Sequence, residues 1–237
     1  MLTTCSQVLP KMGSSHLVGN IYLASSEAQR ACAFPCTTLA PASAPLWTRI
    51  PVCPDAHVYK FRSVVPVDPS IMEKCKDLQW QGSSGSCKKF IWISKCGCSY
   101  THSGIQFTAT SPPEWFLSFE KAVFDFLNFK DHFNCCNVTF YQDGSEGLGW
   151  HADDEPLFGS SAVSKPILSL SIGASRLFGI KVNNTNQTVK LTFNHGDALL
   201  MDGLTQTLCK HKLFSDQNCT LPRVNFTWRK VINHNCS

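Results

Sequence analysis

The sequence predicts an α+β fold that is mainly β, with antiparallel strands arranged as a sandwich or barrel. Three observations support this prediction. Short apolar segments with Gly or Asn between them follow one another after His132, an amphipathic helix precedes them, and there is no strand–helix–strand alternation of the kind that builds a parallel sheet. The hydrophobic content of 43% and the 16 Phe residues are sufficient for a sizeable core.

The chain divides at about residue 58. Residues 1–58 are rich in Ala, Ser, Thr, Pro and Cys and have weak periodicity, so we expect a linker, a loosely ordered extension or the end of a unit cut from a longer chain. Residues 59–233 form the predicted domain, and residues 132–233 contain most of its predicted short strands.

The first part of the predicted domain contains helices and one strand. Residues 68–75 (DPSIMEKC) are expected to open a short helix, and residues 89–94 (KFIWIS) a strand. A longer helix follows residues 111–114 (SPPE), where Ser111 as N-cap, a proline in the first turn and an early acid are start signals. An apolar stripe at helical spacing predicts its core-facing side. The stripe consists of Phe116, Phe119, Val123, Phe126 and Leu127.

The second part contains short predicted strands, each bounded by turn residues. They are residues 137–141, 166–172, 176–182, 188–193, 197–201 and 223–231. His211 lies after a polar connection and is expected to begin one further strand.

Charge and cysteine content narrow the function classes. The net charge of +4 permits an anionic partner, but no run of Lys or Arg predicts a strong basic patch. The 13 cysteines are odd in number and irregularly spaced. Neither Cys96-Gly-Cys98 nor Cys135-Cys136 has the spacing of a structural zinc site. We therefore expect reduced thiols in a cytoplasmic protein. No apolar run approaches the roughly 18–20 residues of a membrane span, and no secretion signal is visible, so no membrane is expected as a partner.

Residues 149–159 (GWHADDEPLFG) contain a candidate metal-binding pair. In extended backbone His151 and Asp153 point to the same side, so both can reach one ion. Taken alone, the stretch is more simply explained as a solvated acidic turn, and a metal site needs a third ligand from a distant strand. Three histidines downstream could supply it, namely His195 in a tight turn, His211 and His234. Two histidines and one carboxylate would form the facial triad of non-haem Fe(II) oxygenases, with three coordination positions open.

The last predicted strand adds a second feature. In residues 223–229 (RVNFTWR), Arg223, Asn225, Thr227 and Arg229 share one face, and apolar side chains share the other. A sheet with one solvent-exposed face would by itself explain this alternation of polar and apolar residues. However, the two arginines are about 20 Å apart along the backbone and can bend inward to grip a short dianion at both ends. An iron site beside a dicarboxylate grip points to 2-oxoglutarate.

Together these segments resemble the AlkB family of Fe(II)/2-oxoglutarate dioxygenases. The matching segments occur in the family's order at residues 100–104 (YTHSG), 141–155 (YQDGSEGLGWHADDE), 169–178 (SLSIGASRLF), 196–203 (GDALLMDG) and 211–229. The resemblance covers about residues 60–233. It implies a double-stranded β-helix (jelly roll) with supporting N-terminal helices and a nucleotide lid.

The resemblance also implies a role for each site residue. His151, Asp153 and His211 would bind Fe(II) and form the catalytic centre. The implied cosubstrate contacts are Arg223, at the distal carboxylate of 2-oxoglutarate, with Tyr141 and Asn225, and Arg229 at the end that chelates iron. The implied base contacts are Glu155, Trp150 and Tyr100. One position departs from the family, because Thr139 stands where an asparagine usually contacts the cosubstrate. Its hydroxyl would replace the amide, or cosubstrate binding would be weaker.

The implied activity is removal of N-methyl groups, of the 1-methyladenine or 3-methylcytosine type, from nucleic acid. It would use Fe(II), 2-oxoglutarate and O2 and would release succinate, CO2 and formaldehyde. The HADDE and SIGASR segments are most similar to AlkB domains of RNA virus replicase polyproteins. This likeness favours RNA over DNA and a monomeric domain of a larger polyprotein in the host cytoplasm. The alternatives are an oxygenase that acts on protein or a small molecule, and an inactive binding module of the same fold.

Overall fold

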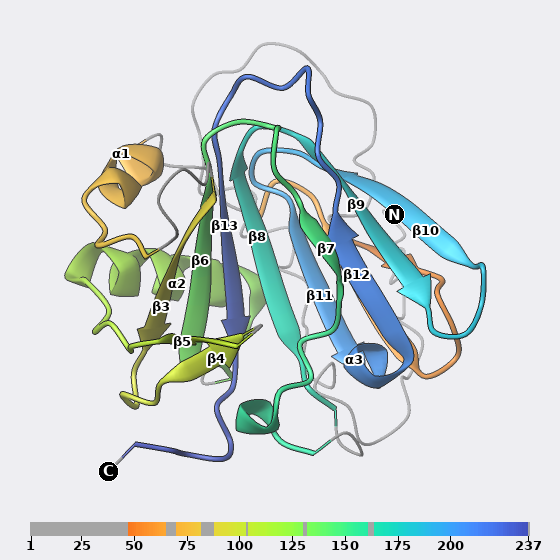
Figure 1. Cartoon of the computed structure of the whole chain (residues 1–237), viewed down its shortest axis with the longest axis horizontal. Coiled ribbons are helices and arrows are strands. Elements are labelled where there is room, and N and C mark those ends of the chain that lie inside the picture. Colours follow the sequence, from red (N-terminus) through yellow and green to blue (C-terminus); the bar gives the residue numbers. More distant parts are fainter. Residues whose placement is uncertain are drawn as a thin grey trace, which may run out of the picture.

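Two antiparallel sheets face each other across the interior of the molecule (Figure 1). The structure, a computed structural model, describes residues 47–64, 70–81, 88–102, 104–129, 132–160 and 164–236. Most of the predicted extension, residues 1–46, lies outside the described residues. The predicted mainly β fold with antiparallel strands is confirmed, because every ladder between named strands is antiparallel.

The large sheet has seven strands in the order β1-β2-β11-β8-β13-β6-β3, and the small sheet has four in the order β10-β9-β12-β7. The strands of the large sheet are β1 (Trp47–Ile50), β2 (Ala56–Phe61), β3 (Lys88–Ser94), β6 (Cys135–Tyr141), β8 (Ile167–Gly173), β11 (Ala198–Gly203) and β13 (Arg223–Arg229). The strands of the small sheet are β7 (Leu148–His151), β9 (Arg176–Val182), β10 (Thr188–Phe193) and β12 (Cys209–Leu213).

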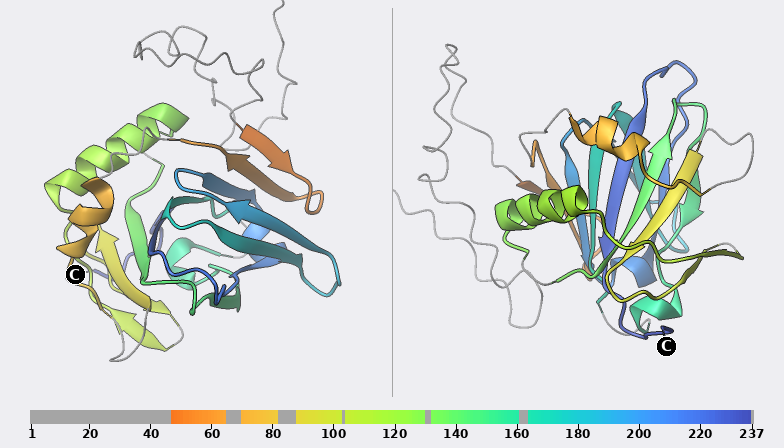
Figure 2. Two further views of the ribbon diagram at one scale, coloured as in Figure 1. Left: turned by 90° about the horizontal axis from the view of Figure 1, so that it is seen from above. Right: turned by 90° about the vertical axis from the view of Figure 1, so that its left-hand side faces the viewer.

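Helices and a hairpin surround the sheets. These elements are α1 (Ser70–Lys76), α2 (Glu114–Leu127), α3 (Thr205–Leu208), a 3-10 turn (Pro156–Phe158) and the hairpin of β4 (Tyr100–His102) with β5 (Ile105–Phe107). Helix α2 lies against the face of the large sheet that points away from the small sheet (Figure 2). The hairpin and α3 were not among the predicted elements, because segments of three or four residues have too little periodicity to be recognised.

The alternation of β13 separates the main core from the interior between the sheets. Val224, Phe226 and Trp228 are fully buried on the side of α2, where the Phe119 ring lies 5.0 Å from that of Phe226 and the Phe124 ring 5.5 Å from that of Trp228. Since successive side chains of a strand point to opposite faces, the polar residues of β13 must point between the two sheets. The polar face of β13 therefore lines the interior of the protein and is not the solvent-exposed face of a sheet.

The interior between the sheets is apolar toward β10 and β11 and polar toward β13. The apolar part is a second core cluster, in which Ile167, Leu199 and Met201 of the large sheet pack with Ile180 and Phe193 of the small sheet. This cluster holds the sheets together at one side and leaves the other side for polar groups.

Two details of α2 differ from the prediction. The N-cap position is Pro113 rather than Ser111, and no side-chain hydrogen bond caps the helix. Phe126 is 39% exposed, whereas Phe124 is buried with the rest of the stripe. At about 100° per residue both positions lie near the edges of the apolar stripe, so the sequence alone does not decide which of the two faces the sheet.

The folded domain begins earlier than the sequence predicted. Residues 47–58 were assigned to the extension, but β1 and β2 belong to the large sheet, where β2 pairs along its whole length with β11. Two prolines, Pro51 and Pro54, interrupt the pattern, and they lie in the connection between the strands, where no ladder N–H is needed. The first part of the domain also contains more strands than the one predicted, since β1 to β5 all precede α2.

Among the described residues, no helix is long and apolar enough to cross a membrane.

The core assignment of α2 can be tested by a matched pair of substitutions. Phe116→Ala should lower the free energy of unfolding by about 3–5 kcal/mol, because this fully buried ring leaves a cavity against Phe226 and Trp228. Phe126→Ala removes the same atoms from a partly exposed position and should cost less than about 1 kcal/mol. Urea unfolding curves of both variants measure the difference, and equal losses would contradict the observed orientation of α2.

Candidate active site

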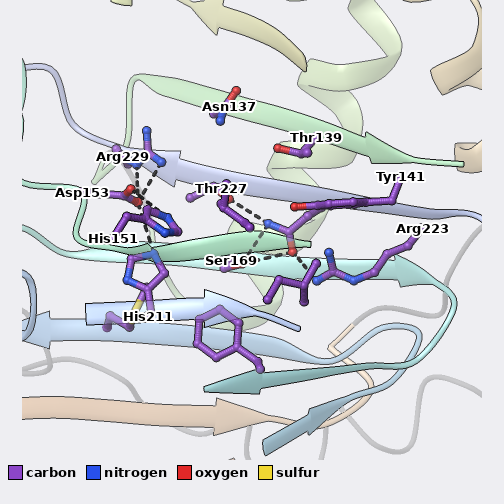
Figure 3. A pocket seen from close by; sticks show the side chains of 15 residues that line it. Asn137, Thr139, Tyr141, His151, Asp153, Ser169, His211, Arg223, Thr227 and Arg229 are labelled. Carbon is purple, nitrogen blue, oxygen red and sulfur yellow. Dashed lines mark hydrogen bonds and ion pairs between the residues drawn. The ribbon is translucent and has the colours of Figure 1, made fainter. Parts of the chain in front are cut away.

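Two histidines of the small sheet and one aspartate converge at the end of β7. His151 and His211 are directly opposite each other in the β7–β12 ladder, and their ring centroids are 4.1 Å apart. Asp153 follows two residues after His151, and its carboxylate oxygens lie 3.6 Å from His151 Nε2 and 3.9 Å from His211 Nε2. All three ligand atoms are within 4.8 Å of one another, so one ion can bind all of them (Figure 3).

Hydrogen bonds orient two of these side chains. His151 Nδ1 is 2.7 Å from the carbonyl oxygen of Gly149, and because a carbonyl only accepts, this nitrogen must carry the proton. With Nδ1 occupied by this contact, Nε2 is the ring nitrogen on the side of Asp153, where it can bind a metal ion. The Asp153 backbone N–H donates to Gln206 Oε1 at 3.0 Å, which fixes the loop that follows β7.

An ion pair between the sheets fixes the aspartate side chain. Arg229, the last residue of β13, donates from Nε at 3.0 Å and from Nη2 at 2.8 Å to Asp153 Oδ2. Burial by itself would raise the pKa of the Asp153 carboxyl, but Arg229, His211 and His151 outweigh burial and hold that pKa well below its usual range. Burial lowers the pKa of His211 to about 3, with a further lowering by His151. At neutral pH the site therefore presents one carboxylate and a neutral His211.

The residues of this site fit a divalent metal ion. Asp153 Oδ1 is buried and has no hydrogen-bond partner among the described residues, so a polar atom that requires a partner faces His151. An ion bound by Oδ1 and both histidine nitrogens would satisfy it. Two histidines with one carboxylate are the ligand set expected for non-haem Fe(II).

A row of polar side chains extends from this site along the large sheet. In the β13–β6 ladder Arg223 is opposite Tyr141, Asn225 opposite Thr139 and Thr227 opposite Asn137, so all six point to the same interior face. They line one pocket together with His151, Asp153, His211 and Arg229 (Figure 3). The empty volume of the pocket, solvent at its mouth included, is about 510 Å³, within the range of small-molecule sites.

Arg223 stands at the end of the pocket away from Asp153. It is buried over the ring of Tyr141, and its Nη2 donates to Ser171 Oγ at 2.8 Å and to Asn225 Oδ1 at 2.7 Å. Burial lowers its pKa to about 10, which leaves the guanidinium charged at neutral pH. Its Nε has no hydrogen-bond partner among the described residues, so a buried donor is available to an anion.

The other predicted cosubstrate contacts are in the same pocket. Tyr141 and Thr139 are buried on β6, and Asn225 donates from Nδ2 to Ser169 Oγ at 3.0 Å and to Thr227 Oγ1 at 2.8 Å. The structure adds Ser169 to the predicted set, and Thr227 lines the same pocket from the polar face of β13 already predicted. A serine within the largely apolar segment 167–173 was the signal in the sequence that could have identified Ser169.

The predicted base contacts separate into two groups. Tyr100 of β4 donates from its hydroxyl to Glu155 Oε1 at 2.7 Å, and its ring lies 5.5 Å from the Arg229 guanidinium carbon. Trp150 does not line the pocket, because it precedes His151 on β7 and points to the opposite face. It is 37% exposed and packs edge-on against Phe214.

The outer face of the small sheet carries a group of lysines that the sequence did not predict. Lys190 of β10 and Lys212 of β12 are both opposite Gly179, and Lys210 is opposite Lys181, so the four amines share one face. His211 points inward between two of them, which places the lysines outside. We name Lys181, Lys190, Lys210 and Lys212 the lysine face. No run of Lys or Arg in the sequence marks this group, because strand pairing gathers lysines that are far apart in the sequence.

Two of the three candidate third ligands are elsewhere. His195 is an exposed turn residue whose Nδ1 accepts from the Gly173 N–H at 2.9 Å, and His234 lies beyond β13 beside Cys98. A buried arginine that the sequence did not single out, Arg176, donates to the carbonyls of Asp143, Glu146 and Phe214 at 2.6–3.1 Å. It fixes the segment that leads into β7, and the alternating pattern of its strand gave no indication of this role.

Comparison with known proteins decides the family. A family model described as the 2OG-Fe(II) oxygenase superfamily matches residues 58–229. The chain belongs to this superfamily. Alpha-ketoglutarate-dependent dioxygenase alkB homolog 3 of Mus musculus is 30% identical over 191 residues, which are 72% of this chain and 64% of that protein. DNA oxidative demethylase ALKBH2 of Mus musculus is 33% identical over 154 residues, which are 61% of this chain and 62% of that protein.

The predicted likeness to AlkB proteins is thereby confirmed, and the chain spans less than two thirds of the length of these curated relatives. The solved structure of OsALKBH1 superposes with a TM-score of 0.52 at 18% identity, over 77% of this chain and 100% of that chain. That likeness supports the jelly-roll fold. Membership of the 2OG-Fe(II) oxygenase superfamily implies the predicted Fe(II), 2-oxoglutarate and O2, and the His151, Asp153 and His211 side chains fit the metal.

The metal centre gives a direct prediction. His211→Ala should weaken Fe(II) binding by more than about 100-fold, since loss of a supporting contact alone typically costs about 10- to 100-fold. His195→Ala removes a histidine outside the site and should leave Fe(II) binding unchanged. Anaerobic Fe(II) titration of both variants measures the affinities. Unchanged binding in His211→Ala would exclude it as a ligand.

Proposed function

We propose that this protein is an oxidative demethylase that removes N-methyl groups from bases of single-stranded nucleic acid, with RNA preferred over DNA. The observation that supports this most strongly is the pocket between the sheets. It has the His151, Asp153 and His211 set at one end and the buried donor of Arg223 at the other. The predicted cytoplasmic location and the origin in a replicase polyprotein remain proposals from the sequence.

Different side chains of the pocket would bind the metal ion and the cosubstrate. His151, Asp153 and His211 would hold Fe(II), while Arg223, supported by Tyr141, would bind a carboxylate at the far end of the pocket. When bound, Fe(II) and 2-oxoglutarate would activate O2 for oxidation of the methyl group. The products would be succinate, CO2 and formaldehyde. Arg229 keeps Asp153 ionised and oriented. Thr139 would complete the cosubstrate contacts with its hydroxyl.

The substrate base would approach from the side of Tyr100 and Glu155. Their hydrogen bond leaves the Glu155 carboxylate fixed close to the metal end, two residues beyond Asp153. A carboxylate accepts hydrogen bonds from exocyclic amino groups such as those of adenine and cytosine. A base must be unstacked to reach such a pocket, which is easiest in a single strand.

The lysine face supports a polyanionic substrate. Four amines on one side of a small sheet can contact successive phosphates, and the exposed Trp150 beside Lys212 offers a ring for stacking. Gly179 permits this arrangement, because a Cβ there would lie 2.9 Å from both Trp150 and Phe214. DNA is the second candidate, since one group of relatives is named DNA oxidative demethylase.

The activity is tested with Fe(II), ascorbate, 2-oxoglutarate and short oligonucleotides that contain 1-methyladenine or 3-methylcytosine. Mass spectrometry should show loss of one methyl group, faster in RNA than in single-stranded DNA, together with succinate. No methyl loss from either polymer would reject the proposed function, and faster turnover of DNA would reject the RNA preference. Succinate without methyl loss would indicate a protein or small-molecule substrate.

Arg223→Met should raise the KM for 2-oxoglutarate by about 10- to 100-fold, because hydrogen bonds to a charged group contribute about 1.5–3 kcal/mol. Arg62→Met, at an exposed position outside the pocket, is the matched control and should leave the KM unchanged. Steady-state succinate formation at varied 2-oxoglutarate measures both. An unchanged KM in Arg223→Met would contradict its assignment.

Lys190→Glu should weaken binding to single-stranded RNA and lower the slope of log affinity against log salt by about 0.7, the value for one lost phosphate contact. Lys89→Glu reverses an exposed lysine of β3 in the large sheet and should not change the slope. Binding is measured by fluorescence anisotropy at several salt concentrations. Equal slopes for Lys190→Glu and the unmodified protein would rule out this surface as a contact.

A further inference from the structure

A second cluster of metal-binding side chains lies outside the candidate active site. The atoms Cys96 Sγ, Cys98 Sγ, Cys236 Sγ and a ring nitrogen of His234 all lie within 4.8 Å of one another. We propose that these four residues bind a structural zinc ion. The proposal does not depend on the demethylase activity, because none of the four lines the pocket between the sheets.

The distances within the cluster suit tetrahedral zinc. Zn–S bonds of about 2.3 Å and Zn–N bonds of about 2.0 Å place sulfur atoms about 3.8 Å apart and sulfur and nitrogen about 3.5 Å apart. Cys98 Sγ lies 3.4 Å from His234 Nδ1, and Cys236 Sγ lies 3.7 Å from the same nitrogen. Cys98 Sγ and Cys236 Sγ are 3.0 Å apart, a separation that a movement of less than about 1 Å adjusts to a zinc site.

The ligand types also suit zinc. Three thiolates and one imidazole form one of the closed sets of structural zinc sites, with no position left for substrate. The sequence prediction rejected Cys96 and Cys98 because no CxxC pair is present, and it considered His234 as an iron ligand. The fold brings this Cys-x-Cys pair to a His-x-Cys pair that follows it by 136 residues, which places His234 away from the candidate active site.

Local structure holds the first pair of ligands in place. Gly97 has a φ of +78°, a conformation that favours glycine, and it allows the turn between β3 and β4 to present both cysteines to one point. The carbonyl of Cys98 accepts from Trp92 Nε1 at 2.7 Å, and Ser94 Oγ lies 3.2 Å from Cys96 Sγ. Cys98 itself is fully buried.

Hydrogen bonds likewise hold the second pair. After β13 the chain runs along the 3-10 turn, where the Ile232 N–H donates to Leu157 O at 3.0 Å and Asn233 Nδ2 donates to Pro156 O at 2.6 Å. Asn235 Nδ2 then donates to Ser99 O at 3.2 Å. Contacts before and after His234 therefore hold it and Cys236 next to Cys98.

The position of the cluster gives the ion a role in the fold. Cys98 lies two residues before Tyr100, and His234 lies five residues after Arg229. A zinc ion would join the start of the β4–β5 hairpin to the segment that leaves β13. It would restrict the movement of the Tyr100 ring relative to Arg229, which lie 5.5 Å apart.

The test uses the full chain with His151→Ala and His211→Ala, so that metal in the iron site does not contribute. After purification with a thiol reductant, elemental analysis should find about one zinc per chain. Replacement of zinc by Co(II) should produce the strong thiolate-to-metal charge-transfer absorption of a tetrahedral site. Removal of the ion by a chelator should lower the Tm and increase amide hydrogen exchange in the β4–β5 hairpin.

Matched variants assign the ligands. Cys236→Ser and His234→Ala change exposed positions that a folded protein tolerates, and each should lose the zinc and reduce the Co(II) charge-transfer absorption. Cys219→Ser changes a thiol outside the cluster and should keep both signals. Zinc retained in full by Cys236→Ser, or no zinc in the parent protein, would overturn the proposal. So would a Cys98–Cys236 disulfide in the reductant-treated protein, detected as a linked peptide by mass spectrometry.

Discussion

The ion pair between Asp153 and Arg229 is the interaction on which the site depends. It joins the two sheets, because Asp153 follows β7 of the small sheet and Arg229 ends β13 of the large one. Two buried charges lose their hydration and are tolerated only with good geometry. Here both donors converge on Asp153 Oδ2, which leaves Oδ1 directed toward His151. The pair therefore fixes the separation of the sheets where three metal ligands must meet.

The core and the pocket share the strand β13, so packing on one face sets the chemistry on the other. Phe226 and Trp228 are locked against α2, and the side chains that alternate with them cannot rotate out of the interior. The polar side chains from Arg223 to Arg229 are thus held in place by apolar contacts on the opposite face of β13, outside the pocket. The pleat of the strand sets the distances between these side chains, so the backbone fixes the separation of Arg223 from the residues around Asp153.

Beyond Arg229 the chain turns toward the hairpin that carries Tyr100. The same short segment contacts the 3-10 turn after Glu155 and approaches the cysteines near Cys98. The region around Tyr100 and Glu155 is consequently built from segments that are remote in sequence. A constraint at this point, whether a metal ion or packing alone, determines how firmly Tyr100 is held beside the metal centre.

The sequence by itself determined the strands with clear alternation and the helix α2, and it placed His151 and Asp153 on one side of the chain as a candidate pair. These features depend on periods of two and 3.6 residues and on near neighbours. It also ordered the motifs well enough to indicate the family. Tertiary structure decided the rest. The pairing of β7 with β12 brought His211, and not His195, next to His151. The register of β13 with β6 placed Tyr141 opposite Arg223 and Thr139 opposite Asn225. The path of the chain after β13 brought His234 to Cys98. Contacts between segments more than fifty residues apart leave no periodic trace in a single sequence, so only the folded chain shows them.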